Sequence, residues 1–239
     1  LDEATNHSRE RLVGGKVLYN YDQVQARLAQ IQSAFTICSA MCVNTSEHAS
    51  IDRDLATHGL EANSIKTCVT DLMQDAAQSL LQLVGAAGYR LDHFAGRAIV
   101  DSRPFQIFEG SNDILYVQIA EALLKQMKIA KEKNLVRYLN SFDLTLRASG
   151  LIKELIEFDL EASLPQRKMT ELGKIVSRIV SMDLVLRLGE KGFDQEMING
   201  SLVNLKQEIA GLLTVCAFDN CSALIDPDSV HPSWREFCS

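Results

Sequence analysis

The sequence contains few residues that interrupt helices. Only 4 prolines and 13 glycines occur among its 239 residues, and Pro104 is the first proline. Proline ends or kinks a helix and an interior glycine weakens one, so long stretches without either residue favour long helices. No segment alternates apolar and polar residues over a length typical of a strand.

Several kinds of function lack their signature in this chain. The formal charge of −7 leaves no cationic surplus for a phosphate backbone, so nucleic-acid binding is not expected. No apolar run approaches the roughly 20 residues that cross a bilayer, which predicts no transmembrane segment. Neither G-x-x-x-x-G-K-[ST] nor a strand-led G-x-G-x-x-G is present, which argues against those two modes of phosphate binding. With 46% hydrophobic and 23% charged residues, the composition is that of a globular domain.

The six cysteines follow neither a C-x-x-C nor a Cys/His spacing, which predicts no metal site. Cys38 and Cys42 lie four residues apart on one face of a predicted helix, where a free thiol behaves as a small apolar group. Reduced cysteines indicate a reducing intracellular compartment, and we expect the bacterial cytoplasm or the mitochondrial matrix.

What the sequence does contain is helical periodicity, with apolar residues three or four positions apart. The stripes are Val24, Leu28, Ile31, Phe35, Cys38 and Cys42, then Ile65, Cys68, Leu72, Ala76, Leu80 and Leu83, and then Ile114, Val117, Ala120, Leu124 and Met127. Further helix-length segments follow at 144–160, 172–188 and 197–218. We therefore predict an all-α fold of roughly six helices. An antiparallel helical bundle is expected over residues 1–130, and a second helical block over residues 131–239, with an irregular tail from residue 226.

Residues 82–89, QLVGAAGY, combine an amide side chain, two glycines and an aromatic residue at a predicted helix end. Gly85 would let a ligand or another backbone approach closely, and Gln82 offers both a donor and an acceptor. The alternative interpretation is a simple glycine C-cap, which the composition alone favours.

Residues 101–114, DSRPFQIFEGSNDI, place the carboxylate of Glu109 between an aromatic residue and a glycine, directly before a predicted helix. Apolar surroundings such as Phe108 disfavour the charged form of an acid, which raises its pKa toward the range of a general base. Ser111 or Asn112 would N-cap the helix, whose free N–H groups can bind an anion or a polar ligand. The alternative interpretation is a surface carboxylate beside a helix dipole.

Together these segments resemble the C-terminal helical bundle of acyl-CoA dehydrogenases. QLVGAAGY is similar to the Q-x-x-G-G-x-G-Y segment of that family, and IFEGSNDI is similar to its [IL]-[YF]-E-G-[TS]-x-x-I segment. DSR at 101–103 stands where the family carries R-D-x-R, and RLVGG at 11–15 stands where it carries R-x-x-F-G. The resemblance covers about residues 1–130 in order and spacing. The sequence departs from the family pattern at Gly14, Val17, Ala86 and Val100.

Residues 131–239 resemble the extra C-terminal domain of very-long-chain-type members through the FDQEMINGSL stretch and the general helical arrangement. This second resemblance is weaker than the first, because it includes no sharp motif.

The resemblance implies α,β-dehydrogenation of acyl-CoA thioesters, with FAD as the hydride acceptor. Glu109 stands where most members carry the base that removes the α-proton, and its backbone N–H corresponds to a donor for the thioester oxygen. Arg11, Gln82 and Gly85 match positions that contact the FAD pyrophosphate and adenosine. Ser111 matches a position close to the phosphate or ribityl region of the flavin.

The resemblance also implies a homodimer, in which residues 82–89 reach the cofactor of the neighbouring subunit, and an electron-accepting flavoprotein as a further partner. Because the chain starts at Leu1 rather than Met and does not include the family's two preceding domains, we expect it to be part of a longer protein. Alone, it is expected to be inactive and to bind FAD weakly or not at all. The alternatives are an acyl-CoA oxidase-like flavoprotein and a non-catalytic helical oligomerisation module.

Overall fold

The computed structural model describes residues 1–50, 55–90, 92–161 and 163–217. Over these residues the chain forms ten α-helices and one antiparallel ribbon of two short strands. The predicted all-α class is therefore confirmed. The predicted tail lies outside the described residues, and so do Cys221 and Cys238.

The long helices lie where the sequence has no proline. The elements of the first half are α1 (Asp2–Glu10), β1 (Leu12–Val13), β2 (Lys16–Val17), the short 3-10 helix η1 (Leu18–Asn20), α2 (Asp22–His48), η2 (Leu55–Thr57), α3 (Gly59–Val84), η3 (Gly85–Tyr89), α4 (Phe94–Ser102), η4 (Arg103–Gln106) and α5 (Asn112–Ala130). The second half contains α6 (Leu135–Leu139), α7 (Leu146–Leu151), α8 (Lys153–Ile156), α9 (Gln166–Glu190) and α10 (Gln195–Ala217). Pro165 caps the start of α9, where its missing N–H costs nothing.

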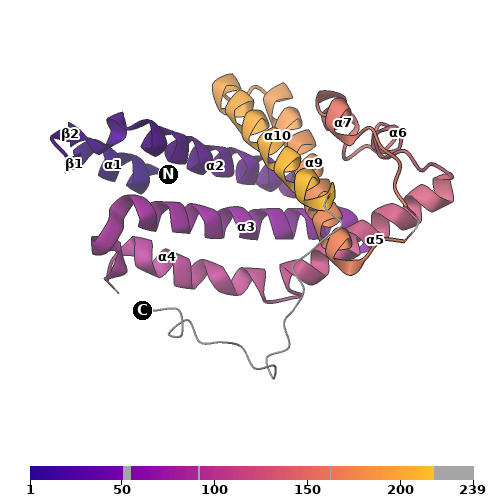
Figure 1. Cartoon of the computed structure of the whole chain (residues 1–239), viewed down its shortest axis with the longest axis horizontal. Coiled ribbons are helices and arrows are strands. Elements are labelled where there is room, and N and C mark those ends of the chain that lie inside the picture. Colours follow the sequence, from indigo (N-terminus) through magenta and orange to yellow (C-terminus); the bar gives the residue numbers. More distant parts are fainter. Residues whose placement is uncertain (51–54, 91, 162, 218–239) are drawn as a thin grey trace, which may run out of the picture.

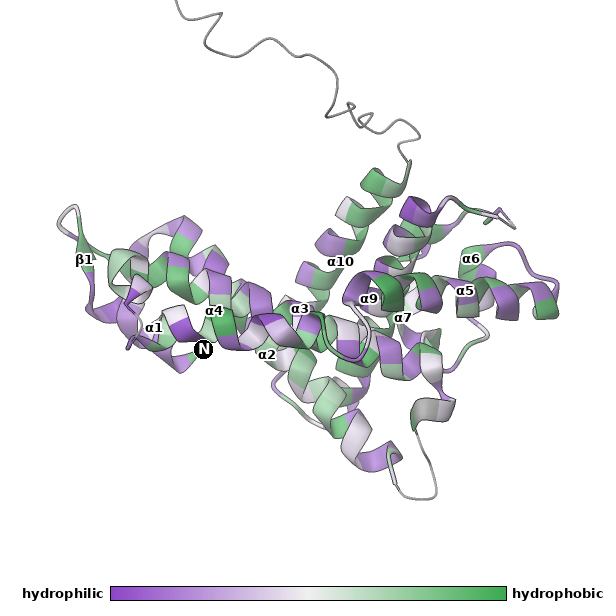
Figure 2. Cartoon of the chain, turned by 90° about the horizontal axis from the view of Figure 1, so that it is seen from below, coloured by the Kyte–Doolittle hydropathy of each residue, from purple (hydrophilic) through white to green (hydrophobic). Residues whose placement is uncertain are grey.

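Figure 1 shows α2, α3 and α4 alongside one another, with α9 and α10 crossing this stack steeply. The β1–β2 ribbon and α1 lie at one end of the stack, and α5 extends from the other. Figure 2 gives the same separation from a second direction, with β1 and α1 at one end and α5 and α6 at the other. The molecule therefore has two distinct ends, joined by α2 and α3.

The β1–β2 ribbon was not predicted from the sequence. Its turn, Gly14–Gly15, has φ values of 58° and 78°. Two consecutive positive φ values define the type I′ turn that suits a two-residue hairpin loop, and glycine adopts them without steric cost. The Tyr21 hydroxyl donates to the carbonyl of Val13 at 2.8 Å, which ties the hairpin to the start of α2. The Gly14–Gly15 pair in the sequence was therefore a signal from which this hairpin could have been predicted.

Two apolar clusters form the core. The smaller cluster joins α1, α2, α3 and α4 at the ribbon end, and the larger joins α2, α3 and α5 to the helices that follow. The larger cluster includes residues from both sides of residue 130, such as Ile119 and Ile179. Helix α9 lies at its centre, because 15 of its 25 residues are buried, and it contacts α2, α3, α5, α7 and α10.

The predicted stripe in α2 is correct only for the first half of the helix. Val24, Leu28 and Ile31 are buried against the smaller cluster, whereas Phe35 is 51% exposed. The buried face rotates because the helix changes partners along its length, from α1 and α3 to α9 and α10. The buried apolar residues of its second half are Ala34, Ile37, Ala40 and Met41.

The predicted helix at 144–160 is wrong, because this segment forms the short helices α7 and α8 with irregular backbone around them. A carboxylate from another helix fixes where α7 begins. The fully buried Asp183 accepts hydrogen bonds from the backbone N–H groups of Arg147 at 2.7 Å and Ala148 at 3.3 Å. Such a distant contact leaves no local periodic signal in the sequence.

Helices α5 and α9 meet backbone to backbone at Gly173. A Cβ atom at this position would lie 1.9 Å from the carbonyl oxygen of Tyr116. Real Cβ atoms do not approach this closely, so any side chain here would force the two helices apart. Glycine in a helix interior costs about 1 kcal/mol relative to alanine, which the close packing of α9 against α5 offsets.

We expect Gly173→Ala to destabilise the fold by about 1–3 kcal/mol, as overpacked core sites do. The measurement is urea unfolding followed by circular dichroism. Gly211→Ala is the matched control, because Gly211 lies in α10 with no atom within 4 Å of an added Cβ. We expect the control to be neutral or stabilising by about 0.4–1 kcal/mol. Equal stability of the two variants would contradict the close crossing.

Candidate functional site

Glu109 lies in the connection between η4 and α5, in a backbone conformation that is uncommon for its residue type. Its φ is 57°, and the following Gly110 has a φ of 94°. A non-glycine residue in the left-handed region is strained by about 1–3 kcal/mol, and such residues cluster at functional sites. The side chains of Glu109 and Phe108 are both exposed, so Phe108 does not bury the carboxylate as the sequence predicted.

Polar side chains on both sides of this loop hold its ends. Lys66 of α3 donates to the carbonyl of Gly110 at 3.0 Å and to the side-chain oxygen of Asn112 at 2.7 Å. The amide of Asn112 donates to Asp71 Oδ1 at 2.6 Å, and the amide of Gln106 donates to the same oxygen at 2.8 Å. Asn112 therefore points inward as an anchor, and Ser111 is the N-cap of α5.

The loop also offers free backbone donors. Within the described part of the chain, the N–H groups of Glu109, Gly110 and Ser111 have no hydrogen-bond acceptor, and Ser111 caps α5 without a side-chain hydrogen bond. Free N–H groups at a helix start carry partial positive charge and can bind an anion or a carbonyl oxygen. A carboxylate and several donors are therefore adjacent in space.

Gln82, Gly85 and Arg11 lie at the ribbon end of the molecule. Gly85 ends α3 with a φ of 71°, so the C-cap interpretation of this glycine is correct, and an added Cβ would meet no atom within 4 Å. Gln82 and Arg11 are exposed. His7 of α1 lies near Arg11 and near the backbone of Leu83, and burial together with the Arg11 cation lowers the pKa of His7. These contacts place Arg11 beside the end of α3.

The two groups of predicted site residues do not meet within one chain. Helix α4 runs antiparallel to α3. Ser102, at the end of α4, donates to Gln74 of α3, and Lys66, nearer the start of α3, donates to Gly110 in the loop that contains Glu109. Gln82 follows Lys66 by 16 residues on the same helix, and a rise of 1.5 Å per residue separates them by about 24 Å. The structure thus brings Glu109 together with Ser111, and Arg11 together with Gln82 and Gly85.

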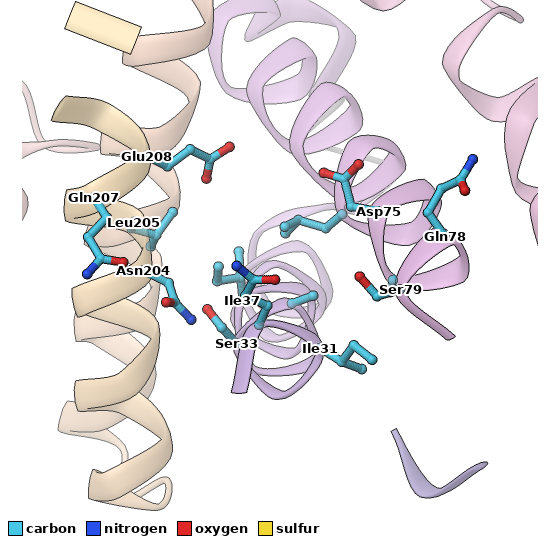
Figure 3. Close-up of a pocket in the computed structure, with 14 residues that line it drawn as sticks. Ile31, Ser33, Ile37, Asp75, Gln78, Ser79, Asn204, Leu205, Gln207 and Glu208 are labelled. Carbon is cyan, nitrogen blue, oxygen red and sulfur yellow. The ribbon is translucent and has the colours of Figure 1, made fainter. Parts of the chain in front are cut away.

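A cavity of about 550 Å³ lies between α2, α3 and α10, away from both groups. Figure 3 shows Asp75 of α3 and Glu208 of α10 extending toward the same space, with Ser33 and Ile37 of α2 beneath them. Burial raises the pKa of Asp75, and the nearby carboxylates of Asp71 and Glu208 raise it further. Arg178, which is ion-paired with Glu208 at 2.8 Å, opposes this rise, and the other polar side chains that line the cavity are neutral.

Two further properties concern metals and membranes. No group of three or more histidine, cysteine or carboxylate side chains with metal-binding geometry occurs among the residues that the structure describes. Within the same residues, no helix is long and apolar enough to cross a bilayer. Cys38, Cys42, Cys68 and Cys216 are free thiols, and burial raises the pKa of Cys38 to about 12.

Comparison with known proteins gives a family match over half of the chain. Residues 1–124 match the family described as acyl-CoA dehydrogenase, C-terminal domain. The very long-chain specific acyl-CoA dehydrogenase of Mus musculus mitochondria is 27% identical over 118 residues, which are 49% of this chain and 18% of that protein. The probable acyl-CoA dehydrogenase FadE25 of Mycobacterium tuberculosis is 29% identical over 125 residues, 52% of this chain and 32% of that protein. The chain thus spans less than a third of the length of these relatives.

A solved structure resembles the chain beyond the family match. The acyl-CoA dehydrogenase of Bacillus anthracis, complexed with FAD, superposes with a TM-score of 0.66 at 15% identity. The superposition covers 89% of this chain and 44% of that one. Because the family match ends at residue 124, the shared fold must include much of the second half.

The raised pKa of Asp75 has a consequence for stability. An acid whose pKa is higher in the folded state makes the fold less stable as pH rises from the unfolded-state value through the folded-state value. We therefore expect Asp75→Asn to raise the melting temperature at pH 7, and this gain to disappear below the unfolded-state pKa of about 4. Thermal unfolding between pH 3 and 7 measures both effects. The control is Glu121→Gln, an exposed site on α5, and an Asp75→Asn gain that persisted at pH 3 would contradict the electrostatic cause.

Proposed function

The chain belongs to the acyl-CoA dehydrogenase family, and from this membership we propose that it is the C-terminal helical portion of an enzyme that dehydrogenates acyl-CoA thioesters. The reaction removes a proton from the α-carbon and a hydride from the β-carbon of the acyl group. FAD, when bound in the complete enzyme, accepts the hydride. This chain contributes the base, donors that orient the substrate, and part of the cofactor contacts.

The observation that carries this proposal is the strained conformation of Glu109. A thioester α-proton is weakly acidic, so its removal needs a carboxylate held at the α-carbon and hydrogen bonds to the enolate oxygen. We assign Glu109 as the base. The left-handed turn leaves the backbone N–H of Glu109 without an acceptor. We assign this N–H as one donor to the thioester oxygen. Substrate and the flavin-binding domains would cover the exposed loop and exclude water from it.

We assign Arg11, Gln82, Gly85 and Ser111 to the cofactor. The exposed guanidinium and amide at the ribbon end suit a pyrophosphate and an adenosine, and the open space at Gly85 lets a dinucleotide approach the backbone. Ser111, with the free N–H groups at the start of α5, suits the phosphate or ribityl region. Because the chain spans less than a third of the length of the relatives described above, we propose that the FAD contacts that it makes are incomplete.

We propose a homodimer for the complete enzyme. About 24 Å separates Gln82 from the Glu109 loop along α3, and a two-fold axis can bring the ribbon end of one subunit to the catalytic loop of the other. Apolar side chains near these elements support such a contact: Tyr89 is 80% exposed, Val100 70% and Phe94 63%. Exposed apolar groups of this size favour an interface.

The remaining assignments concern organisation and setting. We propose residues 1–130 as the family bundle and residues 131–239 as an additional domain, whose described part is helical and packs on the bundle through α9. The two relatives described above are mitochondrial and mycobacterial, and we propose the mitochondrial matrix or the bacterial cytoplasm as the compartment. An electron-accepting flavoprotein would then reoxidise the cofactor.

We expect Glu109→Gln to lower turnover of the holoenzyme that contains this chain by at least about 10³-fold. Glutamine keeps the shape and the hydrogen bonding of glutamate but cannot accept the α-proton. The measurement is the rate of acyl-CoA-dependent flavin reduction, with flavin content checked by absorbance. Asp113→Asn is the control, because it removes a nearby carboxylate from the first turn of α5, and it should retain turnover.

Other outcomes of that experiment separate the alternatives. Retained turnover in Glu109→Gln would place the base on another residue. Rapid reoxidation of the reduced flavin by oxygen would favour an oxidase. A complete protein that binds no flavin at all would favour the non-catalytic module.

The 239-residue chain by itself should bind FAD with a Kd weaker than about 100 μM. Each exposed charged contact contributes about 0–1 kcal/mol, which does not offset the cost of ordering a flexible dinucleotide. Titration calorimetry with FAD measures the affinity, and Arg11→Ala should change it little. Isolation of the chain with stoichiometric yellow cofactor would overturn this expectation.

A further inference from the structure

The Glu109 loop cannot hold its own conformation. Two consecutive residues, Glu109 and Gly110, occupy the left-handed region, which a glutamate adopts only when its surroundings impose it. Within the described residues, the Glu109 side chain makes no hydrogen bond that could impose it. The restraint therefore comes from Lys66, which donates to the Gly110 carbonyl, and from the residues on either side of the loop.

One carboxylate oxygen restrains both sides. Asp71 Oδ1 accepts the amide of Gln106, three residues before Glu109, and the amide of Asn112, three residues after it. The loop is thereby closed on a single atom of α3. We refer to Asp71, Gln106 and Asn112 as the clasp. Displacement of Asp71 would remove a hydrogen bond from each side of the loop at the same time, while Lys66 and Thr70 would still bond to Asn112.

The position of Asp71 depends in turn on the second half of the chain. Its other oxygen, Oδ2, accepts the Tyr116 hydroxyl at 2.5 Å and faces Arg178 Nη2 of α9 at 3.5 Å. Arg178 is only 4% exposed, and its Nε donates to Glu208 of α10 at 2.8 Å. A buried cation is stable only beside opposite charge, so the guanidinium is fixed between these two carboxylates. Figure 3 shows the Glu208 end of this chain of contacts.

We propose that Arg178 is a positioning residue for the Glu109 loop, acting through Asp71, so that α9 and α10 set the geometry of the catalytic carboxylate. Arg178 touches neither Glu109 nor any residue assigned to the cofactor. The expected effect of Arg178 on catalysis rests on the proposed role of Glu109, whereas its expected effect on the loop conformation does not.

Backbone amides that flank the loop provide the test. The N–H groups of Ile107 and Phe108 bond to the Pro104 carbonyl, and that of Leu115 bonds to the Ser111 carbonyl. Hydrogen exchange of these three amides is compared with exchange of core amides in α10, in the full chain. We expect Arg178→Met and Asp71→Asn each to speed loop exchange about tenfold relative to the core.

Two further variants make the readout specific. Arg178→Lys keeps a cation beside Asp71 and should bring loop exchange back to within about threefold of the original. Arg187→Met also removes an ion-paired arginine from α9, but Arg187 pairs with Asp183 and Asp143, away from the clasp. It should change loop and core exchange equally. The double variant of Asp71→Asn and Arg178→Met should match Asp71→Asn alone, since the two residues act in series.

The proposal is overturned if Arg178→Met speeds loop and core exchange equally, or leaves loop exchange unchanged. Asp71→Asn decides the same question if Arg178→Met does not fold. In the holoenzyme, Arg178→Met should lower kcat about tenfold with little change in KM. If Glu109→Gln kept full turnover while loop exchange still responded to Arg178, the assignment of the base would fail and the positioning role would stand.

Discussion

The backbone contact between α5 and α9 at Gly173 is the constraint on which the other contacts depend. Tyr116 lies at this crossing, with its carbonyl against Gly173 and its hydroxyl 2.5 Å from Asp71 Oδ2. Tyr116 therefore contacts α9 through its backbone and hydrogen-bonds Asp71 of the clasp through its side chain. Because α9 lies this close, Arg178 also reaches Asp71 from the buried side. A wider spacing between α5 and α9 would move Arg178 away from Asp71 and leave Tyr116 as the partner of Oδ2.

The helices of this fold were predictable, but their partners were not. Scarcity of proline and glycine, together with apolar spacing, predicted α2, α3, α5, α9 and α10, since long helices leave a repeating signal over many residues. The buried face of α2 rotates where its neighbours change, which a single periodic stripe cannot express. The short helices around Ala148 depend on Asp183, 35 residues away, and such contacts are absent from local sequence patterns.

The candidate site was likewise predictable only in part. The segments around Gln82 and Glu109 were recognisable because glycines and polar residues interrupt apolar helices there. The residues that hold the Glu109 loop, Lys66 and Asp71, were missed. They are polar residues on a helix with a regular apolar stripe, where a charged side chain is usually solvated. Their role follows from which helix lies opposite them, and only the assembled fold provides that information.

Helix α3 links the two ends of the molecule without an interruption. From Asp71 to Gln82 it contains neither proline nor glycine, so its length and rotation are set by helical geometry alone. Adding or removing one residue in this interval would turn one end by about 100° relative to the other, since 3.6 residues complete a turn. Such a change would direct either the clasp or the cofactor-facing end to the wrong side. Insertions and deletions should thus be excluded from this interval during divergence and confined to the connections between helices.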